Sequence, residues 1–119
     1  MRNASIYKVL EISSAHQLAL PYESKCNRLH GHNFKIEIWM DGEIDQNGMV
    51  VDFYLIKKEV MKLDHQNLNE FISIPTAENI SVYLIDKLKT LSDSLKYIKV
   101  RVWETSSAYA EVDEELNED

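Results

Sequence analysis

The chain has 119 residues, of which 45% are hydrophobic and 28% are charged, with 3 glycines and 2 prolines. This length fits one domain, and this composition excludes collagen-like, linker-rich and largely disordered chains. The formal net charge is −7, but six of the 20 acidic residues lie between Glu111 and Asp119. The rest of the chain is therefore nearly neutral and lacks the basic footprint of a nucleic-acid-binding protein.

Cys26 is the only cysteine, so an intrachain disulfide is excluded and a reducing compartment fits. No apolar run approaches the roughly 18 residues that a membrane span needs. The first residues lead into a strand-like pattern without the apolar region of a signal peptide. We therefore expect a cytoplasmic protein with no membrane partner.

The first half of the chain carries two strand patterns. Apolar and polar residues alternate over residues 5–12 and again over 33–41, with Phe34, Ile36, Ile38 and Met40 on the expected inner face. Trp39 interrupts the polar outer face, where it is a candidate contact with another subunit. The residues at 42–48 include Gly, Asp and Asn, which predicts a turn or loop.

Helical spacing follows, and strand alternation then returns. Asp52 and Thr76 are the predicted N-caps of two helices. The apolar stripes of these helices are Phe53, Ile56, Val60 and Leu63 in the first, and Ile80, Leu84, Leu88 and Leu91 in the second. Residues 97–104 alternate again, and a short last strand is expected over 109–112. The order strand, strand, helix, helix, strand, strand predicts an α+β fold, an antiparallel sheet with two helices on one face.

Three of the four histidines share one strand phase. His30 and His32 continue the inward phase of Phe34, and His16 continues the inward phase of the first strand. If these strands pair antiparallel, three imidazoles meet beside the core, where burial without a partner would be costly. Three imidazoles with a fourth position open form a catalytic zinc arrangement, and the pattern favours zinc over three unrelated histidines. The ligand type also fits iron, nickel or copper.

The sequence allows more than one interpretation of two further sites. Cys26 lies four residues before His30, so its thiol could complete a closed metal site or act as a nucleophile or base. Lys25 and Arg28 beside it could meet an anionic substrate. His65 follows Asp64 just past the first helix, which suits proton transfer but equally suits helix-end capping.

Glu104 continues the inward phase of Val100 and Val102, where an apolar side chain is expected. A buried carboxylate needs a partner. That partner is either a protein donor or a ligand, and a carboxylate matches the N–C–N edge of a guanidine-like group such as a pterin. The sequence pattern alone favours neither a protein donor nor a ligand as the partner.

A set of motifs in fixed order closely resembles the 6-pyruvoyltetrahydropterin synthase family. The motifs are Ser13-Ser14-Ala15-His16, Cys26-x3-His30-Gly31-His32-Asn33, Val51-Asp52-Phe53, Leu63-Asp64-His65-x2-Leu68-Asn69, Pro75-Thr76-x-Glu78-Asn79 and Val102-x-Glu104-Thr105. The resemblance implies a tunnelling fold over residues 1–112, followed by an acidic tail at 113–119. It also implies that the sheets of several chains join into a barrel, as a trimer or a dimer of trimers.

The resemblance implies site roles residue by residue. His16, His30 and His32 would bind one zinc ion per subunit, and Cys26 would accept a proton. His65 would relay protons with Asp64 beside it, Glu104 would anchor a pterin, and Thr76 is a weaker candidate contact. Similar sites are built across subunit interfaces, so Cys26 and His65 are expected to come from different chains.

The spacing of Cys26 indicates the branch of the family. Animal-type synthases place the cysteine six residues before the first histidine of the pair, whereas the separation here is four. The shorter spacing looks like the 6-carboxytetrahydropterin synthase branch of queuosine biosynthesis, with 7,8-dihydroneopterin triphosphate as substrate. The alternatives are the pyruvoyl-forming synthase and a non-catalytic zinc-stabilised module closed by Cys26.

Overall fold

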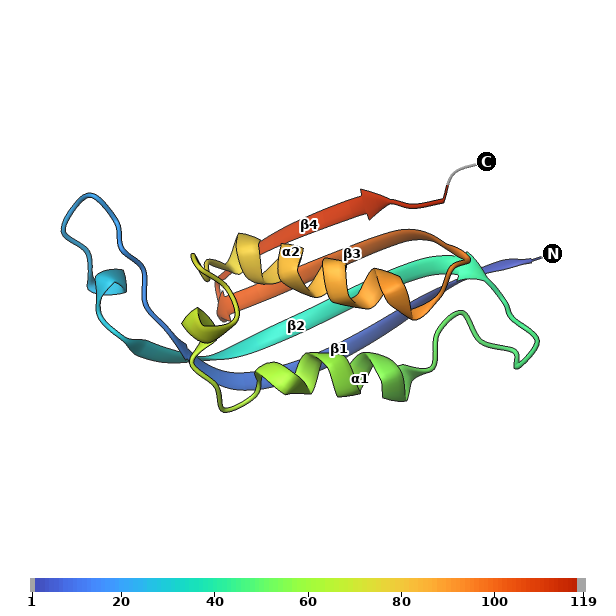
Figure 1. Cartoon of the computed structure of the whole chain (residues 1–119), viewed down its shortest axis with the longest axis horizontal. Coiled ribbons are helices and arrows are strands. Elements are labelled where there is room, and N and C mark those ends of the chain that lie inside the picture. The colour runs from blue at the N-terminus through green and yellow to red at the C-terminus, as the bar shows by residue number, and fades with distance from the viewer. Residues whose placement is uncertain (1, 118–119) are drawn as a thin grey trace.

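The computed structural model describes residues 2–117, which form an elongated body measuring 53 × 26 × 26 Å. Within these residues one antiparallel sheet has its four strands in chain order, and two α-helices cover one face of it (Figure 1). The bounds are β1 Asn3–His16, β2 His30–Glu43, α1 Phe53–Val60, α2 Ala77–Leu88, β3 Leu95–Thr105 and β4 Ala108–Glu115. The predicted fold class and element order are confirmed.

The inward phase of the strands forms the core. Phe34, Ile36 and Ile38 of β2 are fully or almost fully buried, and they pack between β1, β3 and the helices. Both β1 and β2 are longer than predicted, because each continues in register to its histidines. The last pair of the β1–β2 ladder is His16 opposite His30. The ladder therefore places histidines at one end of the sheet.

The predicted N-caps are confirmed. The Asp52 side chain accepts from the Tyr54 N–H at the start of α1, and the Thr76 hydroxyl accepts from the Asn79 N–H at the start of α2. Helix α1 lies against β1, and α2 lies against β3 and β4. The expectation that Phe53 faces the core is wrong, since this first residue of α1 is 47% exposed. The first turn of a helix can extend beyond the edge of the sheet against which its later turns pack.

The acidic C-terminal stretch is more structured than expected. Strand β4 continues to Glu115, three residues beyond the predicted end, because its acidic side chains have partners. Arg101 pairs with Glu111, Lys89 pairs with Glu114, and the Tyr97 hydroxyl donates to Asp113. Residues 113–115, expected in the tail, therefore belong to β4, whereas positions 118–119 lie outside the described residues.

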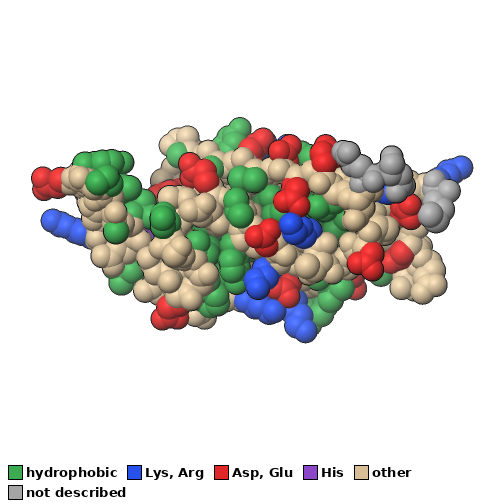
Figure 2. Space-filling view, turned by 45° about the horizontal axis from the view of Figure 1, so that its top comes forward, with side chains coloured by type: hydrophobic (Ala, Val, Ile, Leu, Met, Phe, Trp, Pro, Cys, Tyr) green, Lys and Arg blue, Asp and Glu red, His purple; other side chains and the backbone are tan. Residues whose placement is uncertain are grey.

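The surface carries interspersed charges. On the face seen in Figure 2, acidic and basic side chains alternate with apolar ones, and no extended basic area appears. None of the helices in the described part of the chain is long and apolar enough to cross a membrane. The loop over residues 17–29 projects beyond the histidine-bearing end of the sheet (Figure 1).

Candidate functional site

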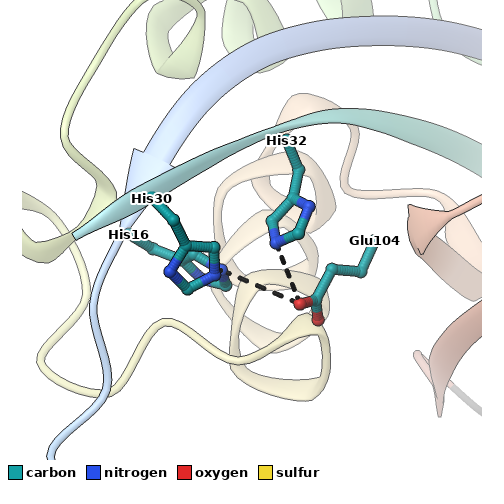
Figure 3. Close-up of side chains that lie close together, drawn as sticks. All are labelled: His16, His30, His32 and Glu104. Carbon is teal, nitrogen blue, oxygen red and sulfur yellow. Dashed lines mark hydrogen bonds and ion pairs between the residues drawn. The ribbon is translucent and has the colours of Figure 1, made fainter. Parts of the chain in front are cut away.

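Three imidazoles lie together at the end of the β1–β2 ladder (Figure 3). The ring centroids of His16 and His30 are 4.5 Å apart, and that of His32 is 5.2 Å from the first and 4.8 Å from the second. His16 is only 1% exposed. The shared strand phase thus brings the three rings to one point, as the sequence pattern predicts.

Backbone carbonyls orient two of the rings. His16 Nδ1 lies 2.7 Å from the Pro75 carbonyl oxygen, and His30 Nδ1 lies 2.7 Å from that of Arg28. Because a carbonyl oxygen only accepts hydrogen bonds, each Nδ1 carries the proton and each neutral ring has its lone pair on Nε2. In a metal-binding histidine, the ring nitrogen that does not bind the metal usually donates a hydrogen bond to a group such as a backbone carbonyl.

The two Nε2 atoms then face one another across 3.0 Å. Two lone pairs at this distance repel unless a cation lies between them. Nitrogen ligands of tetrahedral zinc, bound at about 2.0–2.1 Å, are separated by roughly 3.3 Å. The donor set and its spacing therefore fit a zinc ion.

His32 completes the group of ring nitrogens. Burial lowers the pKa of His32 below its ordinary value, although the nearby Glu104 carboxylate opposes this shift. The neutral imidazole, which burial favours, is the form that binds a metal. Among the described residues its buried Nε2 atom forms an ion-pair contact with Glu104 Oε1 at 3.0 Å and has no other partner. Such a nitrogen is available as a ligand atom.

Glu104 supplies the fourth donor of the cluster. One ligand atom from each of its members, His16, His30, His32 and Glu104, lies within 4.8 Å of all the others. In the described part of the chain this cluster contains a carboxylate and not the Cys26 thiol. The closed Cys-His₃ site considered from the sequence is therefore not what the fold assembles.

Cys26 lies in the projecting loop. It occupies a 3₁₀ turn, Lys25–Asn27, which the Ser24 side chain caps by accepting from the Cys26 N–H. The Cys26 carbonyl accepts from the Leu18 N–H at 2.8 Å, which ties the two arms of the loop together. The thiol is free and half-buried. The loop thus holds a thiol near the histidine-bearing end of the sheet without making it a ligand.

Asp64 and His65 lie along the edge of β1. Asp64 Oδ1 accepts from the Ser13 N–H at 2.8 Å, and the His65 N–H donates to the Ser13 carbonyl at 2.7 Å. The His65 ring is 82% exposed, and its Nε2 is 3.5 Å from Asp64 Oδ2. His65 has a positive φ of 56°, which few residues other than glycine adopt. This conformation turns the ring away from the core.

A groove joins this edge to the cluster. Its volume is about 540 Å³, and its lining includes His32, Asn33, His65 and Gln66. The groove places the exposed imidazole and a cluster histidine on one surface. Thr76, by contrast, uses its hydroxyl to cap α2. Its neighbour Pro75 contributes the carbonyl that orients His16, a role for which the side-chain pattern carries no signal.

Comparisons with known proteins agree with this geometry. The profile of the family described as 6-pyruvoyl tetrahydropterin synthase matches residues 5–115. An Archaeoglobus fulgidus protein provisionally named 6-carboxy-5,6,7,8-tetrahydropterin synthase is 40% identical over 104 residues, which cover 84% of this chain and 87% of that one. The dihydroneopterin monophosphate aldolase of Pyrococcus furiosus is 34% identical over 109 residues, covering 87% and 91% of the two chains.

A solved structure shows the same fold. The 6-pyruvoyl tetrahydropterin synthase of Caenorhabditis elegans superposes with a TM-score of 0.70 at 28% identity, covering 94% of this chain and 96% of that one. The match of the family profile to almost the whole chain and the full-length superposition point to one conclusion. This chain belongs to the 6-pyruvoyl tetrahydropterin synthase family.

Proposed function

We propose that this protein is a zinc-dependent lyase of the cytoplasm that converts 7,8-dihydroneopterin triphosphate to 6-carboxy-5,6,7,8-tetrahydropterin, with water consumed and triphosphate and acetaldehyde released. The observation that carries the proposal is the convergence of three Nε2 atoms, two of them held by carbonyls on their far nitrogens. The four-residue separation of Cys26 and His30 and the name of the 40%-identical relative support the carboxy product. This reaction would supply queuosine biosynthesis.

His16, His30 and His32 would hold one zinc ion per subunit. Zinc bound there would act as a Lewis acid on the hydroxyls of the substrate side chain. Burial lowers the pKa of His32, which favours its neutral, metal-binding form, and the burial of His16 would limit water around the reacting carbons. The carbonyls of Pro75 and Arg28 keep the rings aimed at the same point while substrate enters and leaves.

Cys26, His65 and Glu104 would act on the substrate itself. The Cys26 thiolate would take the proton from the side-chain carbon next to a hydroxyl, a general-base step. His65, oriented by Asp64, would relay protons. Glu104 would accept hydrogen bonds from the guanidine-like edge of the pterin, since a carboxylate offers two acceptor oxygens at matching separation. Thr76, next to the carbonyl that orients His16, stays a weaker candidate contact.

The position of these groups favours a site completed by further copies of the chain. Cys26 lies on a projecting loop and His65 on an exposed edge, and neither belongs to the cluster. Strands β1 and β4 are the two edge strands of the sheet, and unpaired edges are covered in stable proteins. We infer that edges pair between copies in a trimer or a dimer of trimers, so that the Cys26 and the His65 of one site come from different chains.

Product analysis tests the proposal. The zinc-loaded protein is incubated with 7,8-dihydroneopterin triphosphate under anaerobic conditions, and pterins, aldehydes and phosphates are separated by chromatography. The carboxy product with equal amounts of acetaldehyde and triphosphate is expected. A pyruvoyl product without aldehyde would assign the other synthase activity.

Two other results would reject the synthase assignment. Cleavage of the monophosphate substrate that leaves phosphate on the aldehyde fragment would match the aldolase relative. An unchanged substrate, together with unfolding on chelation, would indicate a zinc-stabilised module without catalysis.

A further inference from the structure

Glu104 lies one residue beyond the last pair of the β2–β3 ladder. The last pair of that ladder is Lys35 opposite Trp103, so the backbone at Glu104 has no partner on β2. On the other side, the pairing with β4 shifts register between Trp103 and Thr105. Such irregularities re-aim a side chain, and they are common next to functional sites. Glu104 follows Val100 and Val102 on the inward face of β3, and its side chain points across the gap towards His32 (Figure 3).

Glu104 is the least constrained member of the cluster. His16 and His30 are fixed by the strand register and by hydrogen bonds to carbonyls. The Glu104 side chain is 31% exposed, and its contacts among the described residues are with ring nitrogens, at 3.0 Å from His32 Nε2 and 3.9 Å from His16 Nε2.

These distances suit a ligand of the same ion. Neighbouring donors around a tetrahedral zinc lie roughly 3.3 Å apart. The two Glu104 distances bracket that value. A carboxylate with three imidazoles is a closed four-coordinate site, whereas catalysis needs an open position.

We propose that Glu104 is an exchangeable metal ligand: it closes the coordination sphere while substrate is absent and leaves it when a pterin binds. This inference rests on the proposed function for the identity of the second partner. The proposed function needs both Glu104 oxygens on the guanidine-like edge of a pterin, and we infer that reaching this edge moves the carboxylate off the ion. Binding of the pterin ring therefore opens the fourth position for the substrate hydroxyls. The ion stays closed to other ligands until the correct ring arrives.

Cobalt(II) in place of zinc gives a readout that does not depend on turnover, because its visible absorption reports the number and type of its ligands. Wild type is compared with Glu104→Gln, with Glu104→Ala and with the matched control Glu11→Gln, which changes an exposed glutamate on β1. Zinc affinity is measured by chelator competition, and far-UV circular dichroism checks that each variant is folded. We expect the zinc Kd to rise at least about 10-fold in both Glu104 variants, since even outer partners of metal ligands contribute that much. The Glu11→Gln control is expected to match wild type in affinity and in cobalt spectrum.

The probe for exchange is 6-methylpterin, which has the pterin ring but none of the side-chain hydroxyls. We expect it to shift the wild-type cobalt spectrum towards that of the Glu104 variants, and to leave the spectra of the variants unchanged. Equal zinc affinity and equal cobalt spectra in wild type and Glu104→Gln would overturn the ligand role. Different resting spectra with no response of wild type to bound 6-methylpterin would overturn the exchange.

If the proposed function is wrong, these experiments give a different set of results. If the chain binds no pterin, the fluorescence titration with 6-methylpterin shows no change. If it binds pterins but makes another product, the product analysis described above shows that. The resting comparison of wild type with the Glu104 variants still decides the ligand role. The two hypotheses can therefore fail separately.

Discussion

The Nε2 atoms of His16 and His30 face one another across 3.0 Å, while the Nδ1 of each ring donates to a backbone carbonyl. The carbonyls fix both tautomers, so the facing atoms are two acceptors with no proton of their own. Two neutral rings in this arrangement repel one another, and a cation held between them would remove that repulsion. The described residues therefore form a cluster that could hold a cation.

Metal removal should lower stability. A ligand present at about 1,000 times its Kd and bound only to the folded state stabilises by about 4 kcal/mol. We expect the thermal midpoint to fall on chelation and to return with zinc. The variant His30→Ala is expected to show no response to either treatment. A midpoint that is unchanged when zinc is removed from wild type would contradict the cation site.

Substitution of Cys26 should separate catalysis from metal binding. We expect Cys26→Ala to lower kcat about 10²- to 10⁴-fold, the usual contribution of a general base, because proton removal loses its acceptor. Zinc content should stay at one per chain, since the thiol lies outside the cluster. The matched control is Ser24→Ala, which removes the cap of the same 3₁₀ turn and keeps the thiol. Equal loss of zinc and of turnover in Cys26→Ala would show a ligand role instead.

Two substitutions of Asp64 should divide its structural and catalytic roles. Asp64→Ala leaves the Ser13 N–H without its acceptor, which should cost about 1–2 kcal/mol of unfolding free energy. Asp64→Asn keeps an oxygen acceptor for that N–H but removes the charge near His65. We expect Asp64→Asn to unfold like wild type in denaturant and to lose activity about 10- to 100-fold. Wild-type activity in Asp64→Asn would exclude the proton relay.

The sheet face opposite the helices contains a buried carboxylate that should respond to acid. Glu37 is 8% exposed and accepts hydrogen bonds from the Tyr7 hydroxyl and the Trp103 indole, each at 2.6 Å. Burial disfavours its charged form, but these hydrogen bonds together with the charges of Lys35 and Arg101 lower the pKa of Glu37 below its ordinary value of 4.5. Its contribution to stability is therefore present above pH 4.5 and is lost as the pH falls below that value.

Denaturant unfolding at several pH values checks this prediction. We expect Glu37→Gln to be less stable than wild type by about 1–3 kcal/mol at pH 7, because one of the two donors loses its acceptor. The difference should shrink as the pH falls through the range below 4.5. The control Glu11→Gln, at an exposed position of the same face, should follow wild type throughout. A constant difference between pH 7 and pH 3 would be inconsistent with the ionised, hydrogen-bonded Glu37.

Strand phase accounts for what could be predicted of the site. His30 and His32 share the inward phase of Phe34, and an antiparallel hairpin necessarily brings His16 beside them. The N-caps Asp52 and Thr76 could also be predicted from the sequence, because capping depends on residue type and local spacing. Local rules of this kind are enough for the fold class and for the convergence of the rings.

The remaining features depend on long-range geometry. The carbonyl of Pro75 reaches His16 across 59 positions of the chain, and a backbone group has no residue signature. Alternation places Glu104 on the inward face of β3, but its 3.0 Å approach to His32 Nε2 depends on how β3 packs beside β2. Glu37 lies on the outer face of the sheet, where it accepts from the Tyr7 hydroxyl and the Trp103 indole of other strands. Each case depends on pairs that only the folded chain brings together.

X-ray absorption at the zinc edge of the loaded protein tests the central claim most directly. The account predicts one zinc per chain with nitrogen and oxygen neighbours at about 2.0–2.1 Å, three of them imidazoles, and no sulfur neighbour. A sulfur neighbour at about 2.3 Å, or a chain that takes up no zinc with all three histidines intact, would contradict it.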